Sequence, residues 1–278
     1  MLHPSDNSHR QPLVLKTIAN PMDSVQHPMP LQDVQGHQAK VYRAHLLGLG
    51  DVVVKMFNHN PCPLQGLDEI AELEVALMHA GLPVAHLLSL HQWNDNGLTQ
   101  HAAVYPYYAG GDLFTHILRL HRSKDISPQR LESIAHSTVE MLCTCLRHMH
   151  QHGWVHVDIK AENIFLSQTI ESPDCLAFLG DFGNAVRVGT MISPLTSGSK
   201  GYFPAEDFRG SCFLPAQTSL DLFSVGKVLK IFEYIHRLSP HAQAVMNMLL
   251  APAALRPTAA EMLSTHLPEW LSHIQDRL

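Results

Sequence analysis

The 278-residue chain lacks the features that would place it in a membrane or on nucleic acid. It contains no apolar run of about 18 residues, which a membrane-spanning helix needs, and its N-terminus has no apolar core of signal-peptide length. No long basic run is present, and the net charge is −6 with the histidines counted as neutral. Because proteins that bind nucleic acid carry a positive face, we expect neither a membrane nor a nucleic acid among the partners.

Cysteines are few and are not spaced in pairs. The five cysteines are an odd number, and they lie at Cys62, Cys143, Cys145, Cys175 and Cys212. This pattern favours reduced thiols in a cytosol-like compartment. We therefore expect a cytoplasmic protein, or one in the cytoplasm or nucleus of a host cell if the source is a pathogen.

The composition predicts a folded domain that follows a polar leader. Hydrophobic residues make up 45% of the chain, enough to bury a sizeable core. Residues 1–30 are rich in proline and histidine and have few apolar anchors, so they are predicted to form a flexible leader. No internal repeat is found. Residues 31–278 are predicted to be the folded domain.

The patterns within residues 31–278 predict an α+β fold with two lobes. A strand hairpin is expected around a turn that contains Gly48 and Gly50, followed by a helix over 67–80 and a strand that reaches Val104. The later part is mainly helical, with helices expected at 112–122, 128–152, 219–237, 240–250 and 258–272 and short strands at 164–166 and 178–179. A small strand-rich N-lobe (31–108) thus precedes a larger helical C-lobe (109–278).

One polar loop has the residues needed for phosphoryl transfer. It holds Asp158, Lys160 and Asn163, and Asp181 follows in an Asp-Phe-Gly triplet. A carboxylate can orient an attacking hydroxyl and accept its proton, a lysine can neutralise charge on a phosphate, and amide and carboxylate oxygens can bind Mg²⁺. The loop therefore predicts Asp158 and Lys160 as catalytic residues, with Asn163 and Asp181 as metal ligands.

With these motifs the chain resembles the eukaryotic-type protein kinase family, over residues 31–278. The lysine two residues after Asp158 is typical of serine/threonine kinases. The resemblance implies the two-lobed kinase fold, ATP and Mg²⁺ as cofactors, and transfer of the γ-phosphate to serine or threonine of protein substrates. It also implies a chain that acts as a monomer.

The resemblance assigns the phosphate-binding lysine to Lys55, at the end of an apolar strand. A glutamate from the next helix should orient this lysine, and both Glu72 and Glu74 are candidates. Glu74 shares its helix face with Ile70 and Leu77, so it is favoured.

The resemblance also assigns residues around the nucleotide. Gly36 is the one glycine that remains of the glycine-rich phosphate loop, and this loss puts tight cradling of the phosphates in doubt. The other predicted contacts to the nucleotide come from the first strands, from the segment between the lobes and from the strand after the catalytic loop: Val41, Pro106, Tyr108, Asp112 and Phe165. Tyr105 would be the gatekeeper, and Asp112, which could reach the ribose, could at the same time cap a helix.

Two further motifs are shared with protein kinases. Segment 198–206 resembles the end of the activation loop, where Glu206 is expected to pair with Arg256. Asp221 is expected to brace the catalytic loop.

The chain departs from the family at Val157, where an arginine usually binds an activation-loop phosphate. We therefore expect activity without phosphorylation of the loop. The stretch from 221 to 256 is also short, and this trimmed C-lobe resembles bacterial effector and herpesviral kinases.

Three other interpretations remain. A nucleotide-binding pseudokinase scaffold is the main alternative, because the glycine loop and Val157 are altered, and a small-molecule kinase of the antibiotic type is the second. His148 and His152 are spaced for a metal, but no third ligand is evident. His156 is expected to pack under Phe182 and Met78.

Overall fold

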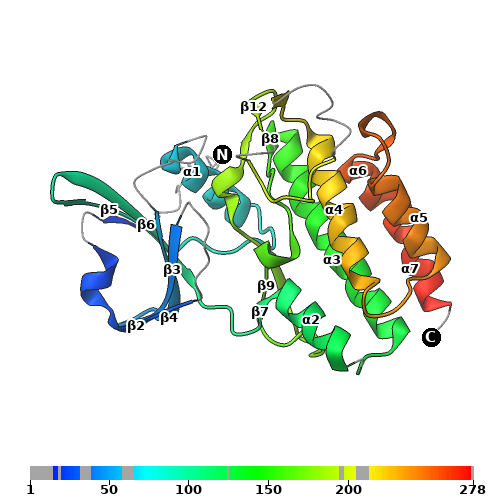
Figure 1. The fold of residues 1–278 in the computed structure, drawn as a ribbon, viewed down its shortest axis with the longest axis horizontal. Helices are drawn as coiled ribbons and strands as arrows, with labels where there is room; N and C mark the ends of the chain where they lie inside the picture. The colour runs from blue at the N-terminus through cyan, green and yellow to red at the C-terminus, as the bar shows by residue number, and fades with distance from the viewer. Residues whose placement is uncertain are drawn as a thin grey trace, which may run out of the picture. The chain divides into compact units, whose positions relative to one another are not determined.

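The structure is a computed structural model that describes residues 15–17, 20–31, 39–57, 66–123, 125–193, 197–204 and 213–276 (Figure 1). Its contacts divide the chain into two units. The first unit comprises residues 1–61 and 86–107, and the second comprises residues 62–85 and 108–278. Within the described ranges no helix is both long and apolar enough to cross a membrane.

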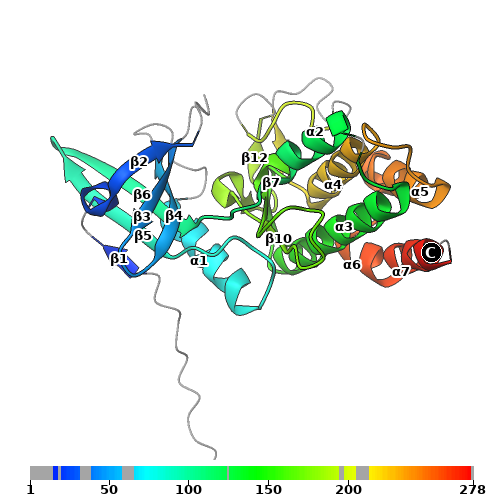
Figure 2. The same ribbon diagram turned by 90° about the horizontal axis from the view of Figure 1, so that it is seen from below.

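The first unit is built on one six-stranded sheet, in the order β1-β5-β6-β4-β3-β2 (Figure 2). Its neighbouring strands are antiparallel except for the parallel pair β1–β5. The elements are β1 (Leu15–Thr17), the 3-10 helix η1 (Pro21–Ser24), β2 (Gln26–Pro30), β3 (Ala39–Leu46), β4 (Gly50–Phe57), β5 (Ser89–Asp95) and β6 (Leu98–Pro106).

The predicted hairpin is confirmed as β3 and β4. Gly48 and Gly50 have φ values of 84° and 78°, a left-handed conformation that glycine adopts without steric cost. The alternating side chains of β3 and β4 place Ala44, Val52 and Val54 in the small apolar core of this unit.

Residues 26–30 were predicted to belong to a flexible leader, but they form β2 at the edge of the sheet. Two prolines, Pro28 and Pro30, lie in this strand. Proline has no N–H for a ladder, which favours an edge strand, where one side needs no partner. The pairing of β2 with β3 therefore orders a segment whose composition alone is typical of a loop.

The second unit contains all the described α-helices: α1 (Leu67–His79), α2 (Leu113–Ser123), α3 (Pro128–Gln151), α4 (Thr218–Phe232), α5 (Pro240–Leu249), α6 (Ala259–Glu261) and α7 (Leu267–Gln275). A π-helical turn, η6 (Met262–His266), joins α6 to α7, and a 3-10 helix, η5 (Ala253–Leu255), precedes α6. The predicted helices are confirmed, although α4 ends earlier than expected. After Phe232 the backbone bonds take three-residue spacing, as in Glu233 N–H to the Lys230 carbonyl, so the chain turns.

Short strands position the loops of the second unit. They are β7 (Gly111–Asp112), β8 (Trp154–Val155), β9 (Ile164–Leu166), β10 (Ala177–Leu179), β11 (Val186–Arg187), β12 (Met191–Ile192) and β13 (Leu214–Pro215). They form the groups β10-β9-β7, β11-β8 and β12-β13. The strands predicted at 164–166 and 178–179 are confirmed as β9 and β10.

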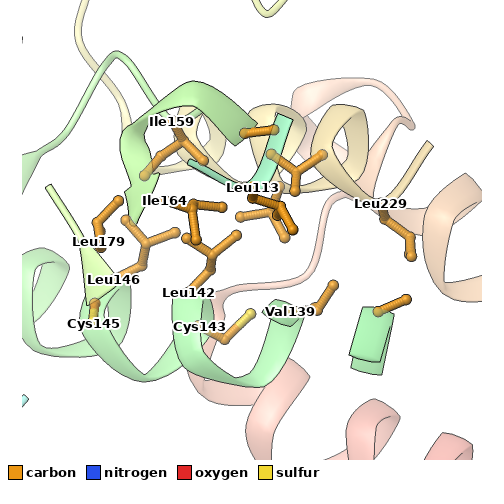
Figure 3. Packing of buried hydrophobic residues seen from close by; sticks show 14 of the residues in the cluster. Leu113, Val139, Leu142, Cys143, Cys145, Leu146, Ile159, Ile164, Leu179 and Leu229 are labelled. Carbon is orange, nitrogen blue, oxygen red and sulfur yellow. The ribbon is translucent and has the colours of Figure 1, made fainter. Parts of the chain in front are cut away.

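Helix α3 is the centre of the core in the second unit. Figure 3 shows Leu142 and Leu146 of α3 pointing toward Ile159, which lies within the polar loop, and Ile164, which directly follows it. All four side chains are completely buried. Burial of a leucine or isoleucine side chain contributes about 1.5–3 kcal/mol, so this packing fixes the polar loop to α3.

Helix α1 belongs to the second unit by its contacts, whereas the predicted N-lobe (31–108) included it. The reason lies in its apolar face. Ile70, Leu73 and Leu77 are buried in the same hydrophobic cluster as α3. The last of the three changes of unit along the chain falls between Tyr107 and Tyr108, inside the segment expected to join the lobes.

Candidate active site

The loop that carries Asp158 is anchored by Asp221 of α4. The carboxylate of Asp221 is completely buried and accepts hydrogen bonds from the N–H groups of His156 and Val157, both at 2.9 Å. It also lies 2.9 Å from Nε2 of His150 on α3. The predicted bracing role of Asp221 is confirmed.

Val157 has a strained backbone. Its φ of 70° is rare for a β-branched residue and costs about 1–3 kcal/mol. The hydrogen bond to Asp221 holds the N–H, and the side chain is buried in an apolar cluster with Val186 and Ile192. Strain that the surroundings hold in place is typical of functional segments, and here it directly precedes Asp158.

The carboxylate of Asp158 is the centre of a hydrogen-bonded group. Lys160 donates from Nζ to Oδ2 of Asp158 at 2.9 Å, and Ser199 donates from Oγ to Oδ1 at 2.7 Å. Nζ of Lys160 also lies 2.7 Å from Oγ of Ser199. Asp158 is 3% exposed, so its orientation is fixed by these partners rather than by solvent.

Asn163 and Asp181 are brought to one end of a strand pair. Asn163 directly precedes β9, and the Gly180 N–H donates to the Asn163 carbonyl at 2.9 Å where β10 ends. The side-chain nitrogen of Asn163 donates to the backbone carbonyl of Asp158 at 2.8 Å and to its Oδ2 at 3.2 Å. Because the Nδ2 atom of Asn163 bonds to Asp158, the Oδ1 atom of the same amide is on the branch that does not face Asp158.

Asn163 and Asp181 are the residues that could hold a magnesium ion. Asn163 offers an amide oxygen and Asp181 a half-buried carboxylate, and hard oxygen ligands are the ones Mg²⁺ prefers. Mg²⁺ usually takes few protein ligands and keeps several waters, so two protein ligands suffice. Asp181 has φ 59° and ψ 66°, a second left-handed residue in the site.

His156 is completely buried, and its predicted packing on Phe182 is confirmed, with ring centroids 4.9 Å apart. Its contact with Met78 stays a prediction. Its Nδ1 accepts a hydrogen bond from the N–H of Asp158 at 3.3 Å. Burial lowers the pKa of His156, against the opposing effect of Asp221, Asp158 and Asp181. The neutral ring therefore helps to hold the loop.

A second group of predicted site residues lies on β7 and β9. Asp112 and Phe165 are paired across these strands. The ring of Tyr108 stacks on Phe165 with centroids 6.0 Å apart and contacts Phe178 at 4.9 Å. A side chain at Gly180 would lie 2.7 Å from the Phe165 ring, so the glycine makes room for this aromatic group.

Asp112 caps helix α2, as the sequence allowed. Its two carboxylate oxygens accept from the N–H of Thr115 at 2.8 Å and from the Thr115 hydroxyl at 2.9 Å. A helix-capping side chain usually accepts a hydrogen bond from such a first-turn N–H, which has no partner within the helix. A contact between Asp112 and a ribose stays a prediction.

Three predicted nucleotide-binding residues lie in the first unit. Val41 and Lys55 are directly opposite each other on β3 and β4, so their side chains share one face of the sheet. Pro106 ends β6. Gly36 lies outside the described residues. Joint binding of one nucleotide by residues of both units stays a prediction.

The structure distinguishes the two candidate glutamates on α1. Glu74 is 2% exposed and shares the buried face with Ile70 and Leu77, whereas Glu72 is exposed. The predicted inward face of α1 is confirmed. The pairing of Glu74 with Lys55 remains to be tested.

Two residues near Asp158 were not predicted. Ser199 lies in the segment identified as the end of the activation loop, so a hydroxyl at this place was a usable signal. Asn184 donates from Nδ2 to Oδ2 of Asp158 at 3.4 Å, and no local pattern indicates it. Both contacts depend on how distant segments fold together.

Arg256 is buried and bound within the second unit, whereas its expected partner Glu206 lies outside the described residues. The Arg256 guanidinium donates to the Ala251 carbonyl at 2.6 Å and to the Ser219 carbonyl at 3.2 Å. It also lies over the Phe223 ring. These contacts give Arg256 a structural role.

A metal at the histidine pair gains no support. The rings of His148 and His152 stack at 4.3 Å, and Nδ1 of His152 lies 2.8 Å from the His148 carbonyl. Among the described residues no group of three or more His, Cys, Asp or Glu side chains could hold a metal ion. The ring stacking accounts for the pair instead.

Comparisons with known proteins agree with these motifs. A family model described as "Protein kinase domain" matches residues 35–267. Serine/threonine-protein kinase US3 of human herpesvirus 1 is 33% identical over 144 residues, covering 51% of this chain and 27% of that protein. The predicted likeness to herpesviral kinases is confirmed.

Two further relatives come from distant organisms. Serine/threonine-protein kinase ULK3 of Xenopus laevis is 29% identical over 166 residues, 59% of this chain and 32% of the relative. Serine/threonine-protein kinase ArnS of Sulfolobus acidocaldarius is 29% identical over 140 residues, 46% and 22% respectively. The matched part of the chain thus spans a third or less of each of these relatives.

Proposed function

Because the chain belongs to the protein kinase family, we propose that it transfers the γ-phosphate of ATP to serine or threonine hydroxyls of protein substrates. The observation that carries the proposal is the hydrogen-bonded Asp158 carboxylate with Lys160 beside it. Its relatives named as serine/threonine-protein kinases support the choice of acceptor.

The proposed reaction is a displacement at the γ-phosphorus of ATP, and groups of this chain can assist it. The acceptor oxygen forms a bond to the γ-phosphorus of ATP while the bond between that phosphorus and the bridging oxygen breaks, and ADP leaves. Asp158 orients the hydroxyl and takes its proton. Lys160 neutralises charge on the transferring phosphoryl group, because this chemistry depends mainly on positioning and electrostatics.

Asn163 and Asp181 would hold Mg²⁺, which supplies positive charge to the phosphate oxygens when bound. Lys55 would bind the α- and β-phosphates, with Glu74 orienting its amine. Val41, Pro106, Tyr108 and Phe165 would contact the base, Asp112 the ribose and Gly36 the phosphates. The family resemblance supports each of these assignments.

We also propose that activity does not require a phosphate on the activation segment, the loop that residues 198–206 close. Val157, in place of the arginine, packs with Ile192 and Leu220 in an apolar cluster. Pairing of β12 with β13 and the bond from the Gly189 N–H to the Ala216 carbonyl at 2.8 Å add to this anchoring. These contacts within the protein support the proposal that the activation segment is held in place without a phosphate.

The proposed setting is a reducing compartment in which a single chain meets its protein substrates. Cys143, Cys145 and Cys175 are free thiols. Free thiols are the usual state of cysteine in a reducing compartment, so they support a cytoplasmic location.

The test measures transfer of labelled γ-phosphate from ATP to a generic protein, followed by phosphoamino-acid analysis. Asp158→Asn should lower the rate about a thousandfold, because it removes the base and leaves the shape. Asp125→Asn, at an exposed position, is the matched control. A wild-type chain that binds ATP but transfers no more than Asp158→Asn would favour the pseudokinase scaffold.

A further inference from the structure

Asn184 is a buried polar residue that the proposed chemistry does not use. The residue is 9% exposed, and its Nδ2 lies 3.4 Å from Oδ2 of Asp158. The two residues are 26 positions apart in the chain, and they belong to different segments of the second unit.

Asn184 is carried by the turn that begins at Asp181. The 3-10 helix η3 (Phe182–Asn184) follows the left-handed Asp181 and closes with a 2.8 Å bond from the Ala185 N–H to the Phe182 carbonyl. Phe182 is 1% exposed and packs on His156. The place of the Asn184 amide therefore depends on the backbone conformation of Asp181.

The other donors to Oδ2 of Asp158 come from its own loop. Lys160 and Asn163 lie two and five residues further on, so they move with Asp158. Ser199 comes from another segment, but it donates to Oδ1. Asn184 thus reaches Oδ2 from outside the loop, unlike Lys160 and Asn163.

We propose that Asn184 is a positioning residue that couples the orientation of Asp158 to the conformation of Asp181. In the observed turn both oxygens of Asp158 are held by donors from other segments. A rotation at Asp181, which moves its carboxylate, would also withdraw the amide of Asn184 from Asp158. The buried amide of Asn184 would then lose this hydrogen bond. The base and the metal ligand are therefore set by one turn.

This inference rests on the proposed function, and it differs from a space-filling role for Asn184. A leucine has the same number and branching of side-chain heavy atoms as asparagine but no donor. If Asn184 only fills space, leucine is tolerated; if its N–H orients Asp158, leucine slows the chemical step and leaves ATP binding intact.

The kinetic test compares Asn184→Leu with wild type. Loss of a hydrogen bond to a charged group should lower kcat about tenfold and leave KM for ATP within about twofold. Asn184→Ser, which keeps a shorter donor, should lie in between. Asn247→Leu, at an exposed position on α5, is the matched control and should match wild type. An unchanged kcat in Asn184→Leu overturns the proposal.

A second measurement tests the coupling without catalysis. Urea unfolding of Asp158→Ala, Asn184→Leu and the double variant forms a double-mutant cycle. The double variant should be destabilised by less than the sum of the single variants, because each substitution removes the same contact. Additive effects overturn the coupling. If wild type transfers no phosphate but the cycle is non-additive, the proposed function is refuted. The contact between Asn184 and Asp158 is then still supported.

Discussion

Ser199 donates from Oγ to Oδ1 of the Asp158 carboxylate at 2.7 Å, across 41 residues of the chain. The same hydroxyl accepts from Nζ of Lys160. One side chain of the activation segment thus contacts both residues that are proposed to act on the acceptor and the phosphate.

Removing this hydroxyl should slow transfer. Ser199→Ala should lower kcat about tenfold to a hundredfold, because a hydrogen bond to a charged group contributes about 1.5–3 kcal/mol. Ser199→Thr keeps the hydroxyl and should retain most activity, whereas Ser199→Asp places a like charge beside Asp158 and should be the slowest. Ser272→Ala, at an exposed position of α7, is the control. Equal rates for Ser199→Ala and wild type would exclude a role for the contact.

The activation segment should work without phosphate. Alanine at Thr190, Ser193, Thr196 and Ser197 together should leave most of the activity in a steady-state assay, because the apolar cluster around Val157 anchors the segment.

Ile192→Asp supplies the contrast, since it places a charge in that cluster and should lower both kcat and the melting temperature. A collapse of activity in the fourfold alanine variant, with Ile192→Asp fully active, would reverse this interpretation.

A buried polar network should stabilise the helical unit. Oε1 of Glu132 on α3 accepts from Nε1 of Trp270 on α7 at 2.8 Å and from the hydroxyl of Ser239, which caps α5. Trp270→Phe removes one donor and should lower the free energy of urea unfolding by about 1–3 kcal/mol for the hydrogen bond, plus a cost for lost volume.

The matched variant combines Trp270→Phe with Glu132→Leu. Each single substitution already breaks the hydrogen bond between Trp270 and Glu132, so the double variant should lose less stability than the sum of the two single losses. If the double variant shows the full sum of the two single effects, Glu132 and Trp270 do not act as a pair.

Stability should fall in mild acid because of His156. Burial lowers the pKa of this residue in the folded chain, so near pH 6.5 and below the unfolded chain binds a proton that the folded chain does not. The free energy of unfolding should then decrease by up to about 1.4 kcal/mol per pH unit from this residue alone, from about pH 6.5 down to the lowered pKa.

Comparison with His156→Leu isolates that effect from the other histidines. The variant should show a shallower decline of unfolding free energy between about pH 6.5 and pH 5.5. Identical slopes for the variant and wild type would show that His156 takes up its proton equally in both states.

The sequence predicted the elements that carry a strong local signal. Helix α3 has a long apolar periodicity, a serine cap at Ser127 and Pro128 in its first turn, so its limits are nearly those expected. The order of Lys55, Asp158 and Asp181 predicted the family, because phosphoryl transfer needs these residue types.

The features of the fold and the site that the sequence did not predict depend on contacts between distant segments. Strand β2 is ordered by pairing with β3, which the prolines of residues 26–30 do not reveal. Ser199 and Asn184 reach Asp158 only after the activation segment and the turn at Asp181 have packed on the loop. Such contacts leave no periodic pattern in the chain.

The most direct test is calorimetric titration of ATP, with and without Mg²⁺, into wild type, Asp181→Asn and Lys55→Met. One ATP should bind per wild-type chain, and Mg²⁺ should strengthen binding to wild type but much less to Asp181→Asn. Lys55→Met should weaken binding in both conditions. Equal strengthening by Mg²⁺ in Asp181→Asn, or wild-type affinity in Lys55→Met, would contradict a single nucleotide site built from these residues.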